Sequence, residues 1–149
     1  MIPPLNGSNM KVFYSRISTQ NQNDDRQLQD IKGFDYVLAD KCSGLIPLFE
    51  RPQGSQLRRL IDEGKLTHLE IHSIDRLGRS LLPCLEVWNE LTSKGISIVC
   101  RNPMLRNIDE KGKPDKFSEL MMSILSTMSS FEKSLIKERQ MEGIKLRKE

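Results

Sequence analysis

The stretch Lys11–Thr19, KVFYSRIST, changes character halfway along its length. Its first residues, Lys11–Tyr14, are typical of a short strand, and the hydroxyl and guanidinium side chains that follow predict a polar loop where the strand ends. A serine at such a strand end is a candidate nucleophile, although no base stands beside it in the sequence. What that serine does depends on the side chains that the rest of the fold brings to the same place.

The chain after this stretch alternates between predicted helices and strands. In chain order we expect a helix at Asn23–Lys32, a strand at Tyr36–Ala39, a helix at Gln56–Glu63, a strand at Leu66–Ile74, a helix at Leu81–Ser93 and a strand at Ile96–Cys100. Strands that alternate with helices predict an α/β fold, with a mainly parallel sheet, right-handed crossovers and flanking helices. The expected parts are a disordered extension at 1–9, an α/β core at 10–114 that ends in an irregular connection over 101–114, and a long helix at 115–149.

The composition is that of a polar globular protein, since 37% of the 149 residues are hydrophobic and 29% are charged. The formal net charge of +3 permits a polyanionic partner without requiring one. Cys42, Cys84 and Cys100 are odd in number and far apart, which predicts neither a disulfide framework nor a zinc site and favours a reducing cytoplasm. No apolar run reaches membrane-spanning length, and Met1–Met10 lacks the regions of a signal peptide, so we expect no membrane partner.

The last part of the chain, from Asp115 to Lys148, contains no proline and reads as one long helix. Its apolar residues recur every four and three positions, as in a helix that packs on another helix. They are Phe117, Met121, Ile124, Met128, Phe131 and Leu135. One interpretation is a helix that covers the core of its own domain and frays at its charged end. We favour an oligomer interface, because the stripe is too long for a domain of this size to cover alone.

Polar side chains follow three of the expected parallel strands. Arg16 and Ser18 follow the first strand, Asp40, Ser43 and Arg51 follow the second, and Asp75, Arg76 and Arg79 follow the third. The carboxyl ends of parallel strands lie along one edge of a sheet, where ligands bind. Four arginines gathered at that edge would repel one another unless an anion lay between them, and guanidinium groups match phosphate oxygens well. The alternative, separate surface arginines paired with nearby carboxylates, is a fair one for Arg51 alone.

The residues expected at this edge also discriminate between acyl transfer and phosphoryl transfer, the two kinds of reaction that a serine could carry out. Acyl transfer usually needs a histidine base, but His68 and His72 lie on the expected third strand and read as packing residues. Phosphoryl transfer needs cations around the transferring group, which arginines supply. Ser18 shares strand parity with Tyr14 and Arg16, whereas Ser15 faces the other way, so Ser18 is the better candidate nucleophile.

Four blocks of the sequence carry a resemblance to a known family. They are Tyr14-x-Arg16-Ile17-Ser18-Thr19, Asp40-Lys41-x-Ser43-Gly44, Asp75-Arg76-Leu77-Gly78-Arg79 and Glu138-Arg139-x-x-Glu142-Gly143. In order and spacing these blocks resemble the catalytic domain of serine site-specific recombinases, the resolvase/invertase family. The resemblance spans nearly all of Met10–Glu149 and implies a resolvase-like α/β catalytic domain with a long C-terminal oligomerisation helix.

The resemblance implies a role for each matching residue. Ser18 would attack a DNA phosphodiester and form a 5′-phosphoserine link, Arg16, Arg76 and Arg79 would bind the scissile phosphate, and Asp75 would orient these arginines. Arg51 and Gln22 match further active-site positions, and Tyr14, Asp40 and Ser43 match supporting ones. The reaction would need no metal and no other cofactor. The partners implied are double-stranded DNA and further copies of the chain, as a dimer that forms a tetramer, with Arg139, Lys145, Arg147 and Lys148 on the DNA backbone.

One departure and two alternatives accompany this interpretation. Small resolvases carry a helix-turn-helix module after the long helix, and this sequence stops at Glu149 with no room for one, so the resemblance leaves site recognition open. The first alternative is a non-catalytic DNA-binding or assembly module with the same fold. The second is a metal-dependent nuclease with Asp40 and Asp75 among its ligands. The cationic character of the site argues against the metal-dependent nuclease.

Overall fold

The structure, a computed structural model, describes residues 9–17, 32–78 and 80–148, with side chains except at 131–133 and 144–148. A sheet of five strands lies at its centre, in the order β2-β1-β3-β4-β5. These strands are β1 (Met10–Ile17), β2 (Tyr36–Lys41), β3 (Leu66–Ile71), β4 (Ser97–Cys100) and β5 (Leu105–Arg106). The first four pair in parallel and β5 pairs antiparallel with β4, which confirms the expected α/β fold.

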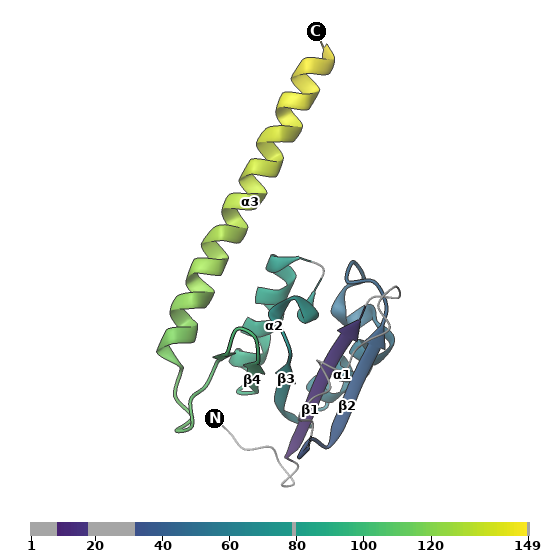
Figure 1. The fold of residues 1–149 in the computed structure, drawn as a ribbon, viewed down its shortest axis with the longest axis vertical. Helices are drawn as coiled ribbons and strands as arrows, with labels where there is room; N and C mark the ends of the chain where they lie inside the picture. The colour runs from purple at the N-terminus through teal and green to yellow at the C-terminus, as the bar shows by residue number, and fades with distance from the viewer. Residues whose placement is uncertain (1–8, 18–31, 79, 149) are drawn as a thin grey trace.

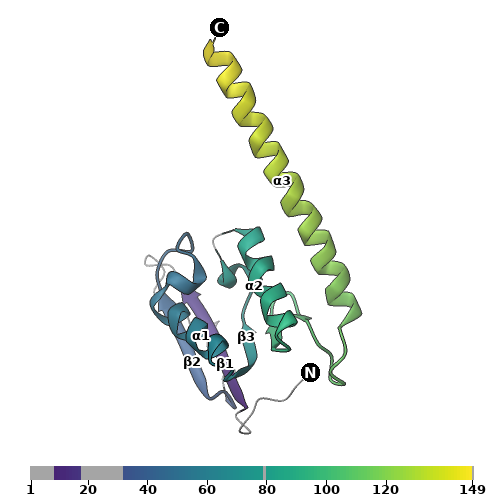
Figure 2. The ribbon, with the colours of Figure 1, turned by 180° about the vertical axis from the view of Figure 1, so that it is seen from behind.

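Two helices pack on one face of this sheet. Helix α1 (Pro52–Asp62) follows the short 3-10 helix η2 (Leu48–Glu50), and α2 (Leu81–Ser93) follows the 3-10 helix η3 (Ile74–Leu77). Figure 2 shows both helices in front of the strands. The core between these layers is apolar and fully closed, with side chains that are 0% exposed from both layers: Val12, Leu57, Leu69, Ile71, Leu91 and Ile98. Burial of such side chains is the main stabilising contribution to a domain of this size.

The structure corrects several expected boundaries. β1 and β2 continue to Ile17 and Lys41, so each strand carries its polar residues into the edge of the sheet rather than leaving them in a loop. β3 ends at Ile71, because Ile74 begins η3. The connection at 101–114 is more regular than expected, since it contains β5 and a bridge between Ile108 and Pro114. The expected helix at 23–32 and the expected extension at 1–9 lie almost wholly outside the described residues.

Helix α3 (Lys116–Lys148) is a single helix of 33 residues that leads away from the sheet, as Figure 1 shows. Among its described side chains, Met122 is buried in the core and Met121 and Leu125 are partly buried against it, and the helix contacts α2 and β5. A hydrogen bond from the Ser118 amide to Asp115 (3.1 Å) caps its start, and the Ser118 hydroxyl accepts one from the Arg106 amide (2.9 Å). Among the helices in the described ranges, none is long and apolar enough to cross a membrane.

A bidentate ion pair joins α1 to α2. Arg58 donates from Nη1 to Glu90 Oε1 at 2.9 Å and from Nη2 to Glu90 Oε2 at 2.5 Å. This hydrogen bonding lowers the pKa of Glu90 to about 2. Because the folded-state pKa lies below the unfolded one, the pair stabilises the fold above about pH 4.5 and loses its effect as the pH falls towards 2.

Replacing Glu90 by glutamine should therefore lower the free energy of unfolding by about 1 kcal/mol at pH 7, since both partners are partly exposed. The difference from the parent protein should shrink steadily between about pH 4.5 and pH 2. Urea unfolding at a series of pH values measures both quantities. Glu86→Gln, at an exposed position of the same helix, is the control. A difference that stays constant down to pH 2 would contradict a stabilising role for the charged Glu90.

Candidate active site

A buried hydrogen-bonded network of Tyr14, Asp40 and Arg51 lies beneath the carboxyl ends of β1 and β2. Asp40, 3% exposed, accepts hydrogen bonds from the Tyr14 hydroxyl (2.7 Å) and from the Gln53 and Gly54 amides (2.8 and 2.9 Å). The two amides belong to the first turn of α1, where a carboxylate is favoured by the helix dipole. Burial, with a further contribution from Asp40, raises the pKa of Tyr14, so its hydroxyl stays protonated and donates to the carboxylate.

Arg51 holds the network together from a position that is 0% exposed. Its Nη1 donates to the Tyr14 hydroxyl (3.2 Å) and to the Arg76 carbonyl oxygen (2.7 Å), and its Nε donates to the Ile46 carbonyl oxygen (2.9 Å). Its Nη2 lies 3.4 Å from the Gly44 carbonyl oxygen. The interpretation of Arg51 as a separate surface arginine is therefore wrong. A charge can be buried in this way because Asp40 lies in the same network and neutral oxygens take up its N–H groups.

Arg16 lies near the carboxyl end of β1, next to this network. It is part of β1, pairs in register with Asp40, and donates from Nη1 to the Cys42 carbonyl oxygen at 3.0 Å. Partial burial lowers the pKa of Arg16, and the positive charges of Arg76 and Arg51 lower it further, while Asp75 opposes them. Arginines from three separate segments thus act on one another electrostatically, as the sequence predicted for Arg16, Arg51 and Arg76.

Asp75 and Arg76 come from η3, directly after β3. Arg76 donates from Nη1 to Asp75 Oδ2 at 2.9 Å, and Asp75 also accepts a hydrogen bond from the Ser73 hydroxyl. The Arg76 side chain is 17% exposed and that of Asp75 is 65% exposed. Asp75 is therefore placed to orient Arg76 from the solvent side, while Arg51 holds the Arg76 backbone from the core side.

Two glycines near these arginines lie unusually close to other atoms. A Cβ at Gly54 would lie 1.8 Å from the Leu48 carbonyl oxygen, so α1 can approach η2 only with glycine there. A Cβ at Gly44 would lie 3.2 Å from Cζ of Arg16. Neither glycine was singled out for a role from the sequence. A signal was present for Gly54, since a glycine in the first turn of a helix often marks a close approach.

The remaining predicted residues of the site fall into two groups. Ser43 is exposed, and its hydroxyl accepts a hydrogen bond from the Leu45 amide at 3.1 Å, which closes the turn after β2. Ser18, Gln22 and Arg79 lie outside the described residues, although Ser18 comes directly after the last residue of β1. His68 shares a hydrogen bond with Ser97 (3.1 Å) and stacks on Phe34, in agreement with a packing role.

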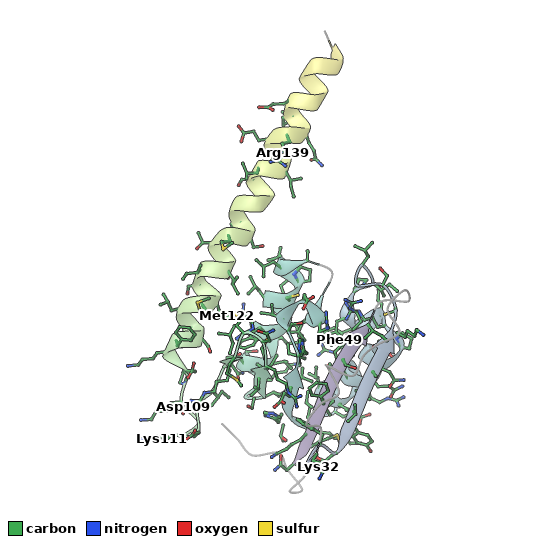
Figure 3. The ribbon with its side chains drawn as sticks, viewed as in Figure 1. Lys32, Phe49, Asp109, Lys111, Met122 and Arg139 are labelled. Carbon is green, nitrogen blue, oxygen red and sulfur yellow. The ribbon has the colours of Figure 1, made fainter. Side chains whose placement is uncertain are left out.

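Along α3 the predicted apolar stripe divides between the core and the solvent. Met121 packs partly against the core, whereas Phe117, Ile124 and Met128 are 62%, 44% and 50% exposed. Leu135 is half-buried, and the Phe131 side chain lies outside the description. Arg139 is exposed on the far half of the helix, as Figure 3 shows, and the side chains of Lys145, Arg147 and Lys148 are not described.

Among residues 9–17, 32–78 and 80–148, no three His, Cys, Asp or Glu side chains are grouped so that they could hold a metal ion. Asp40 and Asp75, the ligands that a metal-dependent nuclease would use, bind hydrogen-bond donors instead. Cys42, Cys84 and Cys100 are all buried and free. Burial raises the pKa of Cys84 to about 12 and that of Cys100 to about 11, so these thiols are not nucleophiles near neutral pH.

Fold and site together define an α/β domain whose strand ends bring the guanidinium groups of Arg16, Arg51 and Arg76 together, with a long projecting helix. The sequence matches the family model described as the resolvase N-terminal domain over residues 11–149. The chain therefore belongs to the resolvase family of serine recombinases.

Relatives in sequence and structure agree with this membership. The Tn21 transposon resolvase of Escherichia coli is 34% identical over 139 residues, which are 93% of this chain and 70% of that protein. The serine recombinase gin of Escherichia phage Mu is 28% identical and matches 91% of this chain and 66% of its own length. The N-terminal catalytic domain of TP901-1 integrase has the same fold, with a TM-score of 0.66 at 22% identity over 85% of this chain and 98% of that one.

Proposed function

We propose that this chain is the catalytic domain of a site-specific DNA recombinase that cleaves and rejoins DNA by phosphoryl transfer. The observation that carries the proposal is the convergence of Arg16, Arg51 and Arg76 from three segments at the carboxyl edge of the sheet. Guanidinium groups held in place before the reaction stabilise the negative charge that builds up on a transferring phosphoryl group.

In the proposed reaction the Ser18 hydroxyl oxygen attacks the scissile phosphorus. A bond forms between this oxygen and phosphorus, and the bond between phosphorus and the 3′ oxygen breaks. The serine proton leaves its hydroxyl and the departing 3′ oxygen gains a proton, so the products are a 5′-phosphoserine and a 3′-hydroxyl. Rejoining is the reverse attack by a 3′-hydroxyl, and the phosphoserine ester conserves the bond free energy, so no nucleotide cofactor and no metal ion is required.

The arginines have different roles in this step. Arg16 and Arg76, together with Arg79 and Gln22, contact the phosphate, and Asp75 orients Arg76 through its ion pair. Arg51 is a positioning residue, because it is 0% exposed and its N–H groups bind Tyr14 and backbone oxygens. Tyr14 and Asp40 hold Arg51 and the start of α1, and Ser43 shapes the turn that leads to them.

In this proposal, the long helix α3 contacts both DNA and other copies of the chain. The exposed residues Phe117, Ile124 and Met128 supply the contact for a homodimer that forms a tetramer when two sites meet. Arg139, Lys145, Arg147 and Lys148, at its far end, follow the backbone of double-stranded DNA. We place the protein in the cytoplasm, where its three free cysteines stay reduced.

The test of the proposed function is to trap the covalent intermediate. Protein is incubated with duplex DNA from its own genetic context that carries a nick near the crossover point, so that the cleaved fragment diffuses away. The expected products are protein joined to the 5′ phosphate of the retained strand and a released fragment that ends in a 3′-hydroxyl, formed equally well with and without a chelator. Salt-sensitive DNA binding with no adduct on any such substrate would favour the alternative, a non-catalytic module of the same fold.

Replacing Ile124 by aspartate should weaken self-association at least about tenfold, because a charge would be buried in the centre of an apolar contact. Sedimentation over a range of concentrations measures the shift towards monomer. Ser130→Asp adds the same charge to an exposed position of the same helix and is the control. Equal dissociation constants for the two variants would show that the stripe is not the contact surface.

A further inference from the structure

We propose that Gly44 is a positioning residue for Arg16, and that the reaction depends on the absence of a side chain at this position. The observation is a close approach of a charged group to the backbone. An ideal Cβ built on Gly44 would lie 3.2 Å from Cζ, 3.3 Å from Nη2 and 3.6 Å from Nε of Arg16. Three guanidinium atoms at such similar distances place the guanidinium group of Arg16 against the Cα of Gly44.

Backbone conformation does not explain why residue 44 is a glycine. Gly33, Gly64, Gly95 and Gly112 have positive φ angles, the left-handed region that favours glycine, whereas the φ of Gly44 lies outside that region. Alanine would therefore fit the backbone of residue 44 without strain. The space beside residue 44 is too small for an alanine side chain, because a contact of 3.2 Å to a Cβ forces a neighbour to move by a few tenths of an ångström.

The atoms nearest to a Cβ at residue 44 belong to the guanidinium group of Arg16, so the movement would fall on Arg16. The Gly44 carbonyl oxygen faces Arg51 Nη2 at 3.4 Å, and Arg51 is fixed by the buried network. Arg16 itself is tied to the Cys42 carbonyl oxygen at 3.0 Å and is repelled by Arg76 and Arg51. Gly44 thus lies close to both the buried Arg51 and the guanidinium group of Arg16.

The consequence for the reaction rests on the proposed function, in which Arg16 contacts the scissile phosphate. A bidentate contact between guanidinium and phosphate tolerates little displacement, and misplacement of a reacting group by about 1 Å can cost about a hundredfold in rate. A shift of a few tenths of an ångström at Arg16 should then cost about tenfold.

The first experiment compares the rates of adduct formation of the full chain on nicked duplex DNA. Gly44→Ala should lower the rate about tenfold. Leu45→Ala, which changes the next residue at a side chain that is 75% exposed, should leave the rate within about twofold. A Gly44→Ala rate within twofold of the parent would overturn the inference.

The second experiment asks whether the effect passes through Arg16, and it needs no catalysis. The thermal midpoint is measured for the parent, Gly44→Ala, Arg16→Ala and the double variant. Gly44→Ala should lower the midpoint in the parent, and in the Arg16→Ala background it should leave the midpoint unchanged or raise it, since alanine restricts the unfolded chain more than glycine does. The same loss in both backgrounds would overturn the inference.

The two experiments also separate this inference from the proposed function. If the parent protein forms no adduct, or if the adduct forms without Ser18, the proposed function fails while the thermal cycle still decides whether Gly44 positions Arg16. If the adduct depends on Ser18 and the thermal cycle shows no coupling, the function stands and the role of Gly44 is wrong.

Discussion

Replacing Ser18 by alanine should abolish the protein–DNA adduct, with a fall in rate of at least about a thousandfold, the scale on which covalent catalysis depends on its nucleophile. Binding to the same duplex should change little, because that binding rests on arginine and lysine contacts to phosphates. Denaturing electrophoresis of the reaction on nicked DNA measures the adduct, and a mobility shift measures binding.

The matched control is Ser15→Ala. Ser15 is 1% exposed and lies in β1 opposite Ala39, three residues before Ser18 and on the other face of the sheet from Arg16. This variant should keep its rate within a few-fold. An adduct that survives in Ser18→Ala and disappears in Ser15→Ala would reverse the assignment of the nucleophile.

The second large effect is expected from Arg51→Ala, which should lower the free energy of unfolding by about 3–5 kcal/mol. Removing one partner of a buried charged network leaves the other charge uncompensated, and here that charge is Asp40 beside Tyr14. The Arg76 carbonyl oxygen loses its donor in the same variant, so the adduct rate should fall even under conditions where the protein remains folded.

Arg59→Ala tests whether the loss is specific. Arg59 lies in the last turn of α1 and is exposed, so its removal should change stability by no more than about 0.5 kcal/mol. Arg51→Lys keeps the charge but cannot reach four acceptors in a plane, and should give an intermediate loss. Chemical denaturation supplies the three free energies. A loss in Arg51→Ala no larger than in Arg59→Ala would show that the buried network stabilises nothing.

The fold was predictable because its signals are local. The alternation of apolar strands with amphipathic helices indicated the parallel sheet, and the spacing from Phe117 to Leu135 indicated the long helix before any tertiary contact was known. The gathering of Arg16, Arg51 and Arg76 was predictable too, because parallel strands place their carboxyl ends along one edge.

How deeply each arginine side chain is buried could not be predicted from such local patterns. Sequence pattern alone treats Arg51 as a charged residue in a polar loop, whereas the structure buries it completely between Tyr14 and the Arg76 backbone. Burial of that kind depends on partners 37 and 25 residues away, which no local pattern encodes. The close approach at Gly44 was hidden for the same reason, since the atoms nearest to it belong to Arg16 in β1.

Among the residues that the structure describes, the contacts of helix α3 with the core lie near its start, at Ser118, Met121, Met122 and Leu125. At 1.5 Å per residue its 33 residues span roughly 50 Å, so a tilt of about 5° at this attachment carries the far end through about 4 Å. The attachment consists of a few hydrogen bonds and a small apolar contact. A small change in its geometry would therefore displace the far end of the helix much more than its start. If α3 binds DNA as proposed, Asp115 and Ser118 would therefore help to set where Arg139 meets it, although they lie at the opposite end of the helix.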